Sequence, residues 1–510
     1  MELDPDRIVT DELGAGEVKE ICEEITARNL GKTVAPSKFA TLNEDAVRQH
    51  SDKKRSGAYE YAQNPYQEDS RRGRFSNAYE RLARKTQVCT NPTRDHITSR
   101  LIHADRVAQI SRAIARAIGA NEDLTEAIAR LHDIGHAPLG HLGEELVTRA
   151  VFDSNKELMG TLGVFRHNIQ GVHVVDRVAT RKGFLEGGLN LTDQVRHGIL
   201  SHDGEVYTGA ISPNRDLKPE DLDGDIQRYM KEVIAVSGKP KESDPEAIKK
   251  HIEAMQVVVG SEFDIEGLDD DVQDYIKKVI KISGQVKVEC DLADPEAVNE
   301  HVKAIEKAVK GVTIAPATIE ACIVFIVDVL HYAPEDFEDI IALGEAKREH
   351  LPLYVSKRLG TNVADMMHAM ITDLVVHSYG KDQVGYSEEV GNILNRFKKE
   401  FLYPRYYRIN SWAYSDARDP RIDIPPTPKG GLRERMVFLF DRYLEALKDP
   451  GRHSKSSIVR GYLAGRDMKS YLGQMWHCET EEARLYQTVI DYVSGFTDNF
   501  FFSESEDMHR

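Results

Sequence analysis

The sequence contains few cysteines, and their spacing argues against the folds that cysteine chemistry stabilises. Five cysteines are scattered over 510 residues, and no two of them are spaced as CxxC. An odd number of dispersed cysteines favours neither a disulfide framework nor a zinc knuckle. We therefore expect a reduced, cytoplasmic protein.

Long apolar segments are also missing. The N-terminal stretch MELDPDRIVT is charged and lacks the apolar region of a signal peptide. One of the longest apolar runs, IEACIVFIVDVL at 319–330, is too short and too charged to cross a bilayer. We expect a soluble protein with no membrane partner.

The chain has no excess of positive charge. Its formal net charge is −17, which argues against a protein whose whole surface grips nucleic acid, although a local basic channel is compatible with it. An acidic protein that handles polyanionic nucleotides needs a metal ion and a few well-placed arginines or lysines. The length allows two or three domains.

Helical periodicity dominates what is present. In RVAQISRAIARAIGA, the apolar residues Val107, Ile110, Ile114 and Ile118 recur at steps of three and four, as on one face of a helix. The next segment begins with Asn121, a favourable N-cap, and continues with acidic residues. Alternating strand patterns are few and short. The sequence predicts a mainly α fold.

The middle of the chain contains an internal repeat. DIQRYMKEVIAVSG (225–238) resembles DVQDYIKKVIKISG (271–284), and DPEAIKKHIEAM (244–255) resembles DPEAVNEHVKAI (294–305). These pairs predict a duplicated module at 210–312. Chance similarity between amphipathic helices is the alternative interpretation.

The stretch RLHDIGHAPLGHLGEE, residues 130–145, is unusually rich in histidine. His132 and Asp133 end a predicted helix, and adjacent helical residues point about 100° apart. They can reach one ion only near the helix end, which the break at Gly135 and Pro138 allows. Imidazole nitrogen and carboxylate oxygen together bind a borderline divalent metal.

Further ligands must come from elsewhere in the chain. His103 begins the preceding amphipathic helix, and Asp328 interrupts the apolar run IVFIVDVL. An aspartate in such a run costs several kcal/mol in solvation unless it is paired or bound to metal. Taken alone, each residue could equally be a structural histidine or a capping or paired aspartate.

The order His103, then His132-Asp133, then Asp328 resembles the H…HD…D pattern of the HD superfamily of metal-dependent phosphohydrolases. The sequence is most similar to the deoxynucleoside triphosphate triphosphohydrolase branch, often called dGTPase-like. Its hallmarks occur in order as YERLARKTQV (79–88), SRLIHADRVAQIS (99–111), HDIGHAPLGHLGEE (132–145), FRHNIQ (165–170) and IVDVLHYAPEDFEDI (326–340). The resemblance covers residues 64–205 and 315–342, so the duplicated module between them looks like an insertion.

This resemblance implies an HD-domain helical core interrupted by the module and followed by a helical C-terminal region. The expected divisions are an N-terminal arm (1–60), which is polar and irregular, the first part of the catalytic core (61–209), the inserted regulatory or assembly module (210–312), the second part of the core (313–413) and the C-terminal region (414–510). Four prolines and two glycines at 414–431 predict a linker or loop there.

The resemblance also implies that His103, His132, Asp133 and Asp328 hold one divalent ion per subunit. Two imidazoles favour Mn²⁺, Fe²⁺, Co²⁺ or Zn²⁺ over Mg²⁺, which prefers oxygen ligands. We expect Mn²⁺ as the activating ion.

Catalytic roles follow from the same resemblance. His141 and Glu144 are three residues apart on one helix face, and the family pattern assigns them to proton transfer. His136 resembles a substrate-facing histidine of some family members, and a purely structural role is its alternative.

The substrate-binding residues implied by the family lie on either side of this motif. Gln87 and Asp336 resemble residues that bind the sugar 3′-hydroxyl, and Tyr332 resembles a tyrosine that packs under the deoxyribose. Arg100 is a candidate phosphate ligand through its guanidinium fork, and His167 is a second candidate for that neighbourhood.

A continuous helix would place Asp328, Tyr332 and Asp336 on one stripe, because they are spaced four residues apart. Pro334 predicts a bend in that helix. Further on, segment 395–414 interleaves cationic and aromatic residues. Such a segment could stack single-stranded nucleic acid or bind triphosphate, but an amphipathic packing helix near an oligomer interface is the favoured interpretation.

The expected activity is metal-dependent hydrolysis of dGTP or of dNTPs generally to deoxynucleoside and inorganic triphosphate, which would control dNTP pools. The expected partners are a dNTP substrate, a nucleotide effector and further copies of the chain. Two alternatives stay open. One is another HD phosphohydrolase, such as a 5′-nucleotidase or a cyclic-nucleotide phosphodiesterase, and the other is a nucleic-acid-binding sensor with a vestigial HD site.

Overall fold

The computed structural model describes residues 14–29, 36–50, 63–88, 97–155, 158–180, 188–204, 209–216, 314–344, 346–407, 431–463, 478 and 480–506. Over these residues the protein is mainly α-helical, which confirms the predicted fold class. The two strands found there, β1 (Ala210–Ile211) and β2 (Val384–Gly385), pair antiparallel with Ala210 opposite Gly385. None of the helices in the described part of the chain is long and apolar enough to span a membrane.

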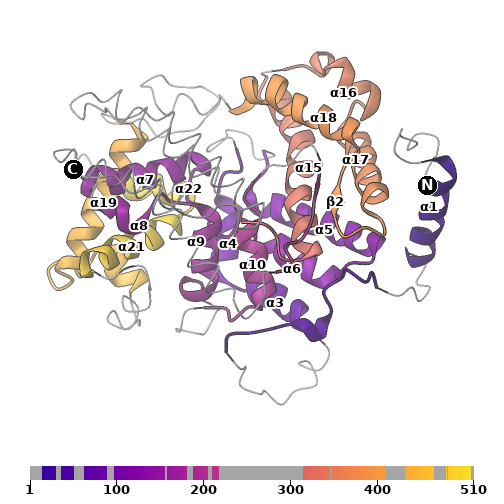
Figure 1. The fold of residues 1–510 in the computed structure, drawn as a ribbon. Helices are drawn as coiled ribbons and strands as arrows, with labels where there is room; N and C mark the ends of the chain where they lie inside the picture. Colours follow the sequence, from indigo (N-terminus) through magenta and orange to yellow (C-terminus); the bar gives the residue numbers. More distant parts are fainter. Residues whose placement is uncertain are drawn as a thin grey trace, which may run out of the picture.

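Figure 1 shows the arrangement of the helices. The longer ones are α1 (Ala15–Asn29), α3 (Pro65–Arg74), α5 (Arg100–Ile118), α6 (Glu122–Leu131), α7 (His141–Asn155), α10 (Asp193–Ser201), α15 (Ile319–Ala342), α17 (Val363–Ser378), α18 (Glu388–Arg396), α19 (Leu432–Lys448), α21 (Glu481–Ser494) and α22 (Asp498–Ser505). The short ones include α4 (Asn77–Arg81), α8 (Met159–Leu162), α9 (His167–His173) and α16 (Leu353–Arg358), and residues Phe397–Tyr407 form a π-helical segment.

Helices α5 and α6 form a hairpin at the centre of the core. α5 ends at Gly119, whose φ of 78° a residue with a side chain rarely adopts. α6 then begins because the Asn121 side chain accepts hydrogen bonds from the backbone N–H groups of Asp123 and Leu124. α6 packs against α3, α5, α10 and α15. The end of α6, with His132 as its C-cap, therefore lies inside the protein.

Helix α15 crosses this core and continues through Pro334. It packs against α5, α6, α10 and α17, and its residues 321–324 are buried on every side. Pro334 does not end the helix, so Asp328, Tyr332 and Asp336 lie on one stripe as their spacing predicts. Asp328 of this stripe lies beside His103 of α5 and His132 at the end of α6.

The C-terminal helices cover the opposite side of the histidine-rich stretch. In Figure 1, α19, α21 and α22 surround α7, while α16, α17 and α18 lie beside α15. α19 packs directly against α7, α21 and α22. The end of the chain is therefore built onto the helix that begins with His141.

The N-terminal residues differ from the prediction of an irregular arm. Residues Ala15–Asn29 form α1, which packs against α5 and α17. Val18 and Cys22 bury their side chains against Val376, so a small apolar stripe in an otherwise polar segment is sufficient to dock this helix. The duplicated module lies outside the described residues except for 210–216, and so does the predicted linker except for Gly431.

Candidate metal and catalytic site

The four predicted metal ligands meet in the structure. His103 comes from α5, His132 and Asp133 from the end of α6, and Asp328 from α15. His103 Nε2 lies 2.8 Å from Asp328 Oδ1 and 3.8 Å from Asp133 Oδ2. His132 Nε2 lies 3.5 Å from Asp133 Oδ2 and 3.7 Å from Asp328 Oδ1. His103, His132 and Asp133 thus offer ligand atoms that all lie within 4.8 Å of one another, and Asp328 adjoins this group through the two histidines.

The donor atoms fit a divalent ion. Ligand atoms about 2.1 Å from one ion lie roughly 3.0–3.4 Å apart, and the four contacts between a histidine and an aspartate given above, at 2.8–3.8 Å, are close to that range. His132 Nδ1 lies 2.6 Å from the Ala129 carbonyl oxygen, which places the imidazole proton on Nδ1. His132 Nε2 is buried and has no hydrogen-bond partner. A buried lone pair of this kind is what a metal ion would satisfy.

Both carboxylates of this group are held in the anionic form. Burial alone would raise the pKa of Asp133, but Arg100, His132 and His136 lower it well below its ordinary value. Burial likewise opposes ionisation of Asp328, but the hydrogen bond and the positive charge of His103 lower the pKa of Asp328. Anionic carboxylates are the state that binds a cation.

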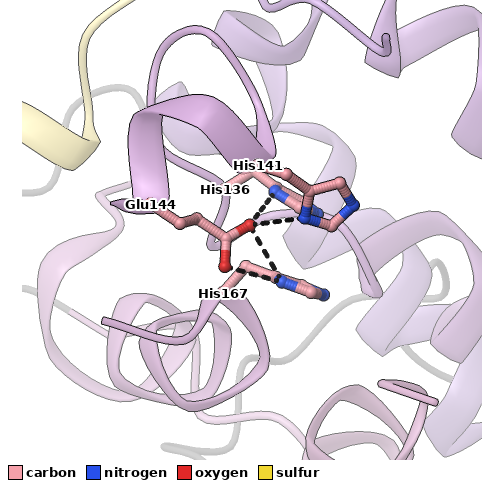
Figure 2. A group of neighbouring side chains, drawn as sticks. All are labelled: His136, His141, Glu144 and His167. Atoms are coloured by element: carbon pink, nitrogen blue, oxygen red, sulfur yellow. Dashed lines mark hydrogen bonds and ion pairs between the residues drawn. The ribbon is translucent and has the colours of Figure 1, made fainter. Parts of the chain in front are cut away.

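A second cluster is centred on Glu144, as Figure 2 shows. Its Oε1 atom lies 2.8 Å from His136 Nδ1, 3.1 Å from His141 Nδ1 and 3.2 Å from His167 Nδ1. Burial would raise the pKa of Glu144, but His167 and His136 lower it well below its ordinary value. The side chain of His141 is 68% exposed, whereas those of His136 and His167 are buried. Of these imidazoles, only that of His141 is open to a substrate.

His136 links the two clusters. Its Nε2 lies 3.0 Å from Asp133 Oδ1, and its ring stacks on that of His167 with centroids 3.8 Å apart. Burial, with the charges of Arg100 and His167, lowers the pKa of His136 to about 3. Such a weak base favours a positioning role for His136 over proton transfer.

The loop between the clusters needs unusual backbone geometry. Leu139 and Gly140 have φ values of 68° and 62°, and a Cβ on Gly143 would lie 1.7 Å from the Pro138 carbonyl oxygen. A Cβ on Gly135 would lie 2.0 Å from the carbonyl oxygen of His167. The glycines that interrupt the histidine-rich stretch are therefore required for the chain to turn and for α9 to approach.

Residues of the C-terminal region hold this loop. Asp498 Oδ1 accepts a hydrogen bond from Leu139 N at 2.8 Å, and Oδ2 accepts hydrogen bonds from the backbone and hydroxyl of Thr86. The buried Lys85 Nζ donates to the carbonyl oxygens of His136 and Ser494. Burial lowers the pKa of Lys85 to about 7. The sequence carried no signal for these contacts, because all but one join residues more than 350 positions apart, and in the exception Lys85 donates to a backbone carbonyl.

Two of the predicted substrate residues, Arg100 and Gln87, adjoin the metal cluster. Arg100 is buried, and its Nη1 donates to Asp133 Oδ2 at 2.9 Å while Nη2 donates to the Gln87 carbonyl oxygen at 3.3 Å. In this state the guanidinium supports a proposed metal ligand, and phosphate binding by Arg100 stays a prediction. The side-chain Oε1 of Gln87 is buried without a hydrogen-bond partner, which suits an acceptor for a hydroxyl group.

Tyr332 contacts a lysine that was not singled out from the sequence. Lys398 Nζ donates to the Tyr332 hydroxyl and lies 4.6 Å from the centre of its ring. Burial lowers the pKa of Lys398 to about 7. Lys398 belongs to the cationic and aromatic segment 395–414, of which residues 408–414 lie outside the described part. Phe397 and Phe401 pack against Phe337 of α15, so the described portion is a packing segment that also brings Lys398 to Tyr332.

Comparison with known proteins agrees with this geometry. Residues 100–233 match the HD domain family, and the chain therefore contains an HD domain. It is similar to proteins named deoxyguanosinetriphosphate triphosphohydrolase-like protein, which confirms the resemblance drawn from the motifs.

Three such relatives illustrate the extent of the similarity. The protein of Bartonella tribocorum is 40% identical over 175 residues, which cover 34% of this chain and 40% of the relative. The protein of Caldanaerobacter subterraneus subsp. tengcongensis is 42% identical over 172 residues, which cover 34% of this chain and 43% of the relative. The protein of Geobacter metallireducens is 48% identical over 126 residues, which cover 24% of this chain and 30% of the relative. The chain thus spans less than half the length of each of these relatives.

The contacts of Asp498 generate a prediction about positioning. We expect Asp498→Ala to keep its bound metal but to lose about 10- to 100-fold in turnover, since a displacement of the His141 loop by about 1 Å costs that much. Asp498→Asn, which keeps one acceptor for Leu139 N, should show a smaller loss. The measurements are the steady-state rate of hydrolysis of dNTPs, the expected substrates, and the metal content of the protein. Asp382→Ala is the control, because the side chain of Asp382 is exposed. Unchanged turnover in the folded Asp498→Ala protein would contradict the positioning role.

Proposed function

We propose that this protein is a divalent-metal-dependent triphosphohydrolase that converts dNTPs into deoxynucleoside and inorganic triphosphate. The observation that carries the proposal is the convergence of His103, His132, Asp133 and Asp328 beside the His141–Glu144 pair. The names of the relatives support the substrate class. Hydrolysis of dGTP or of dNTPs generally, and control of dNTP pools, belong to the same proposal.

The four clustered residues would hold the ion. When bound, a divalent ion would supply a Lewis acid that lowers the pKa of a water molecule and neutralises charge at the α-phosphate. The two imidazoles favour Mn²⁺ over Mg²⁺. Arg100, which contacts Asp133 Oδ2, would keep that carboxylate oriented.

The proposed reaction requires a proton for the leaving oxygen. Water attacks the α-phosphorus, the bond from phosphorus to the 5′-oxygen breaks, and the oxygen leaves as a hydroxyl group after it receives a proton. His141 is the exposed imidazole at the site, and Glu144 holds its Nδ1 at 3.1 Å. Its Nε2 is then the nitrogen available for proton transfer.

The sugar would lie against the stripe on α15. Tyr332 and Asp336 follow Asp328 at four-residue steps, and Gln87 offers a buried unpartnered oxygen. We propose that Gln87 and Asp336 bind the 3′-hydroxyl and that Tyr332, braced by Lys398, excludes a 2′-hydroxyl. This arrangement supports a deoxynucleotide over a ribonucleotide. Assembly into a homo-oligomer and control by a nucleotide effector are further parts of the proposal.

Product analysis tests the function directly. The full chain is incubated with each of four dNTPs and four rNTPs in Mn²⁺ or Mg²⁺, and products are separated by ion-exchange chromatography. We expect deoxynucleoside and inorganic triphosphate from at least one dNTP, little reaction with rNTPs, and no reaction with the Asp328→Ala variant. Monophosphate or orthophosphate as product would indicate another HD phosphohydrolase, and a metal-loaded protein that yields no product would indicate a sensor.

The proton-transfer role of His141 gives a separate prediction. We expect His141→Ala to bind metal normally and to lose a factor of about 10² or more in kcat, the usual scale for a general acid. His368→Ala on α17 is a matched control, because His368 is exposed. Turnover of His141→Ala close to that of the control would move the role to His136 or His167.

A further inference from the structure

Helix α15 contacts both ring nitrogens of His103. Asp328 Oδ1 lies 2.8 Å from His103 Nε2, and His331, three residues further along the same helix, has its Nδ1 3.1 Å from His103 Nδ1. Both histidines are buried. Their ring centroids are 5.0 Å apart and the rings are tilted by 59°, so they meet through these nitrogen atoms and not face to face. One helix therefore holds the imidazole of His103 at both of its nitrogens.

The proton between the two imidazoles can be assigned. At 3.1 Å, one Nδ1 carries a hydrogen and the other a lone pair, because two lone pairs or two N–H groups at that distance repel each other. The proposed metal ligand His103 needs a lone pair on Nε2, so its proton lies on Nδ1. His103 therefore donates to His331, and the proton of His331 lies on Nε2.

The stability of the fold does not account for an imidazole at position 331. His331 Nε2 is buried and has no hydrogen-bond partner among the residues that the structure describes, and a buried N–H without a partner is unfavourable. An apolar side chain of similar size would remove this N–H and leave His103 Nδ1 unpaired instead. Each arrangement leaves one buried nitrogen unpaired, so the contact with His103 is what distinguishes histidine from leucine here.

The other histidine of the proposed metal centre is oriented in the same way. His132 Nδ1 lies 2.6 Å from the Ala129 carbonyl oxygen. Metal-ligating histidines usually donate their second N–H to a carboxylate, a backbone carbonyl or water, which fixes the tautomer and the direction of the ring. At His103 a neutral imidazole takes that place. It orients the ring without adding a third negative charge to those of Asp133 and Asp328.

We propose that His331 is a positioning residue for the metal centre, because it accepts the Nδ1–H of His103 and so directs the Nε2 lone pair toward the site of the ion. The inference rests on the proposed function and deepens it. His331 acts through His103, and its loss should weaken metal binding while the fold remains.

Metal affinity tests this role. The affinity of the metal-free full chain for its tightest-bound Mn²⁺ ion is measured from the electron paramagnetic resonance signal of the free ion. We expect His331→Leu to weaken that affinity by about 10- to 100-fold, the usual effect of removing a partner that orients a metal ligand. His331→Asn, whose Oδ1 occupies nearly the position of the histidine Nδ1, should restore most of it. The thermal unfolding temperatures of the metal-free proteins should differ little.

His197→Leu provides the matched control. His197 is also buried, and neither of its ring nitrogens has a hydrogen-bond partner in the described part of the chain. Its replacement removes a buried imidazole away from His103 and should leave Mn²⁺ affinity unchanged. Native affinity in His331→Leu, an equal loss in His197→Leu, or no rescue by asparagine would overturn the proposal.

A second measurement decides if His331→Leu does not fold. The unaltered protein, labelled with ¹⁵N-histidine and loaded with diamagnetic Zn²⁺, is studied by nuclear magnetic resonance. A protonated Nδ1 on His103 beside an unprotonated Nδ1 on His331 would support the proposal, and the opposite assignment would overturn it.

These results are separable from the proposed activity. The expected order of affinities in a protein that releases no product from any dNTP would support the role of His331 and contradict the proposed function. Triphosphate release, with equal Mn²⁺ affinity in the unaltered protein and His331→Leu, would do the reverse.

Discussion

The site depends on burying the Asp133 carboxylate among positive and potentially positive groups. Its Oδ2 atom faces Arg100 and His132, and its Oδ1 atom faces His136. An isolated buried carboxylate would be strongly unfavourable, so these partners are a condition of folding and not only of chemistry. Asp133 and Asp328 together carry two negative charges, and the neighbouring Arg100 neutralises only one of them. A cation at this position would complete the balance.

The helical scaffold explains how such a charge can be buried. α5, α6 and α15 carry one side of the cluster, and their apolar faces form a continuous core around it. On the other side, α7 and α9 carry Glu144 and His167, and the C-terminal helices hold the connecting loop through Asp498 and Lys85. The motif residues are therefore held in place by helices from nearly the whole described chain.

The sequence predicted which residues come together in the site where those residues belong to a recognisable motif. The resemblance to the HD superfamily implied His103, His132, Asp133 and Asp328 as one group, and the structure brings them together, while metal binding by them stays a prediction. The spacing of His141 and Glu144 likewise predicted their contact, because helix geometry fixes it.

Other contacts could not be predicted because no local rule connects the residues involved. Asp498 reaches Leu139 only after α21 and α22 pack against the core. Lys398 meets Tyr332 through a π-helical segment whose register the sequence does not reveal. The helix α1 was missed because only a few of its residues are apolar.

The central claim is that His103, His132, Asp133 and Asp328 form one metal centre, and anomalous diffraction tests it most directly. Crystals of the full chain equilibrated with Mn²⁺ would be measured on both sides of the manganese absorption edge. The account predicts an anomalous peak within about 2.0–2.3 Å of His103 Nε2, His132 Nε2 and one oxygen of each aspartate. Manganese bound only at the Glu144 cluster, or absent while Arg100 alone neutralises Asp133, would contradict it.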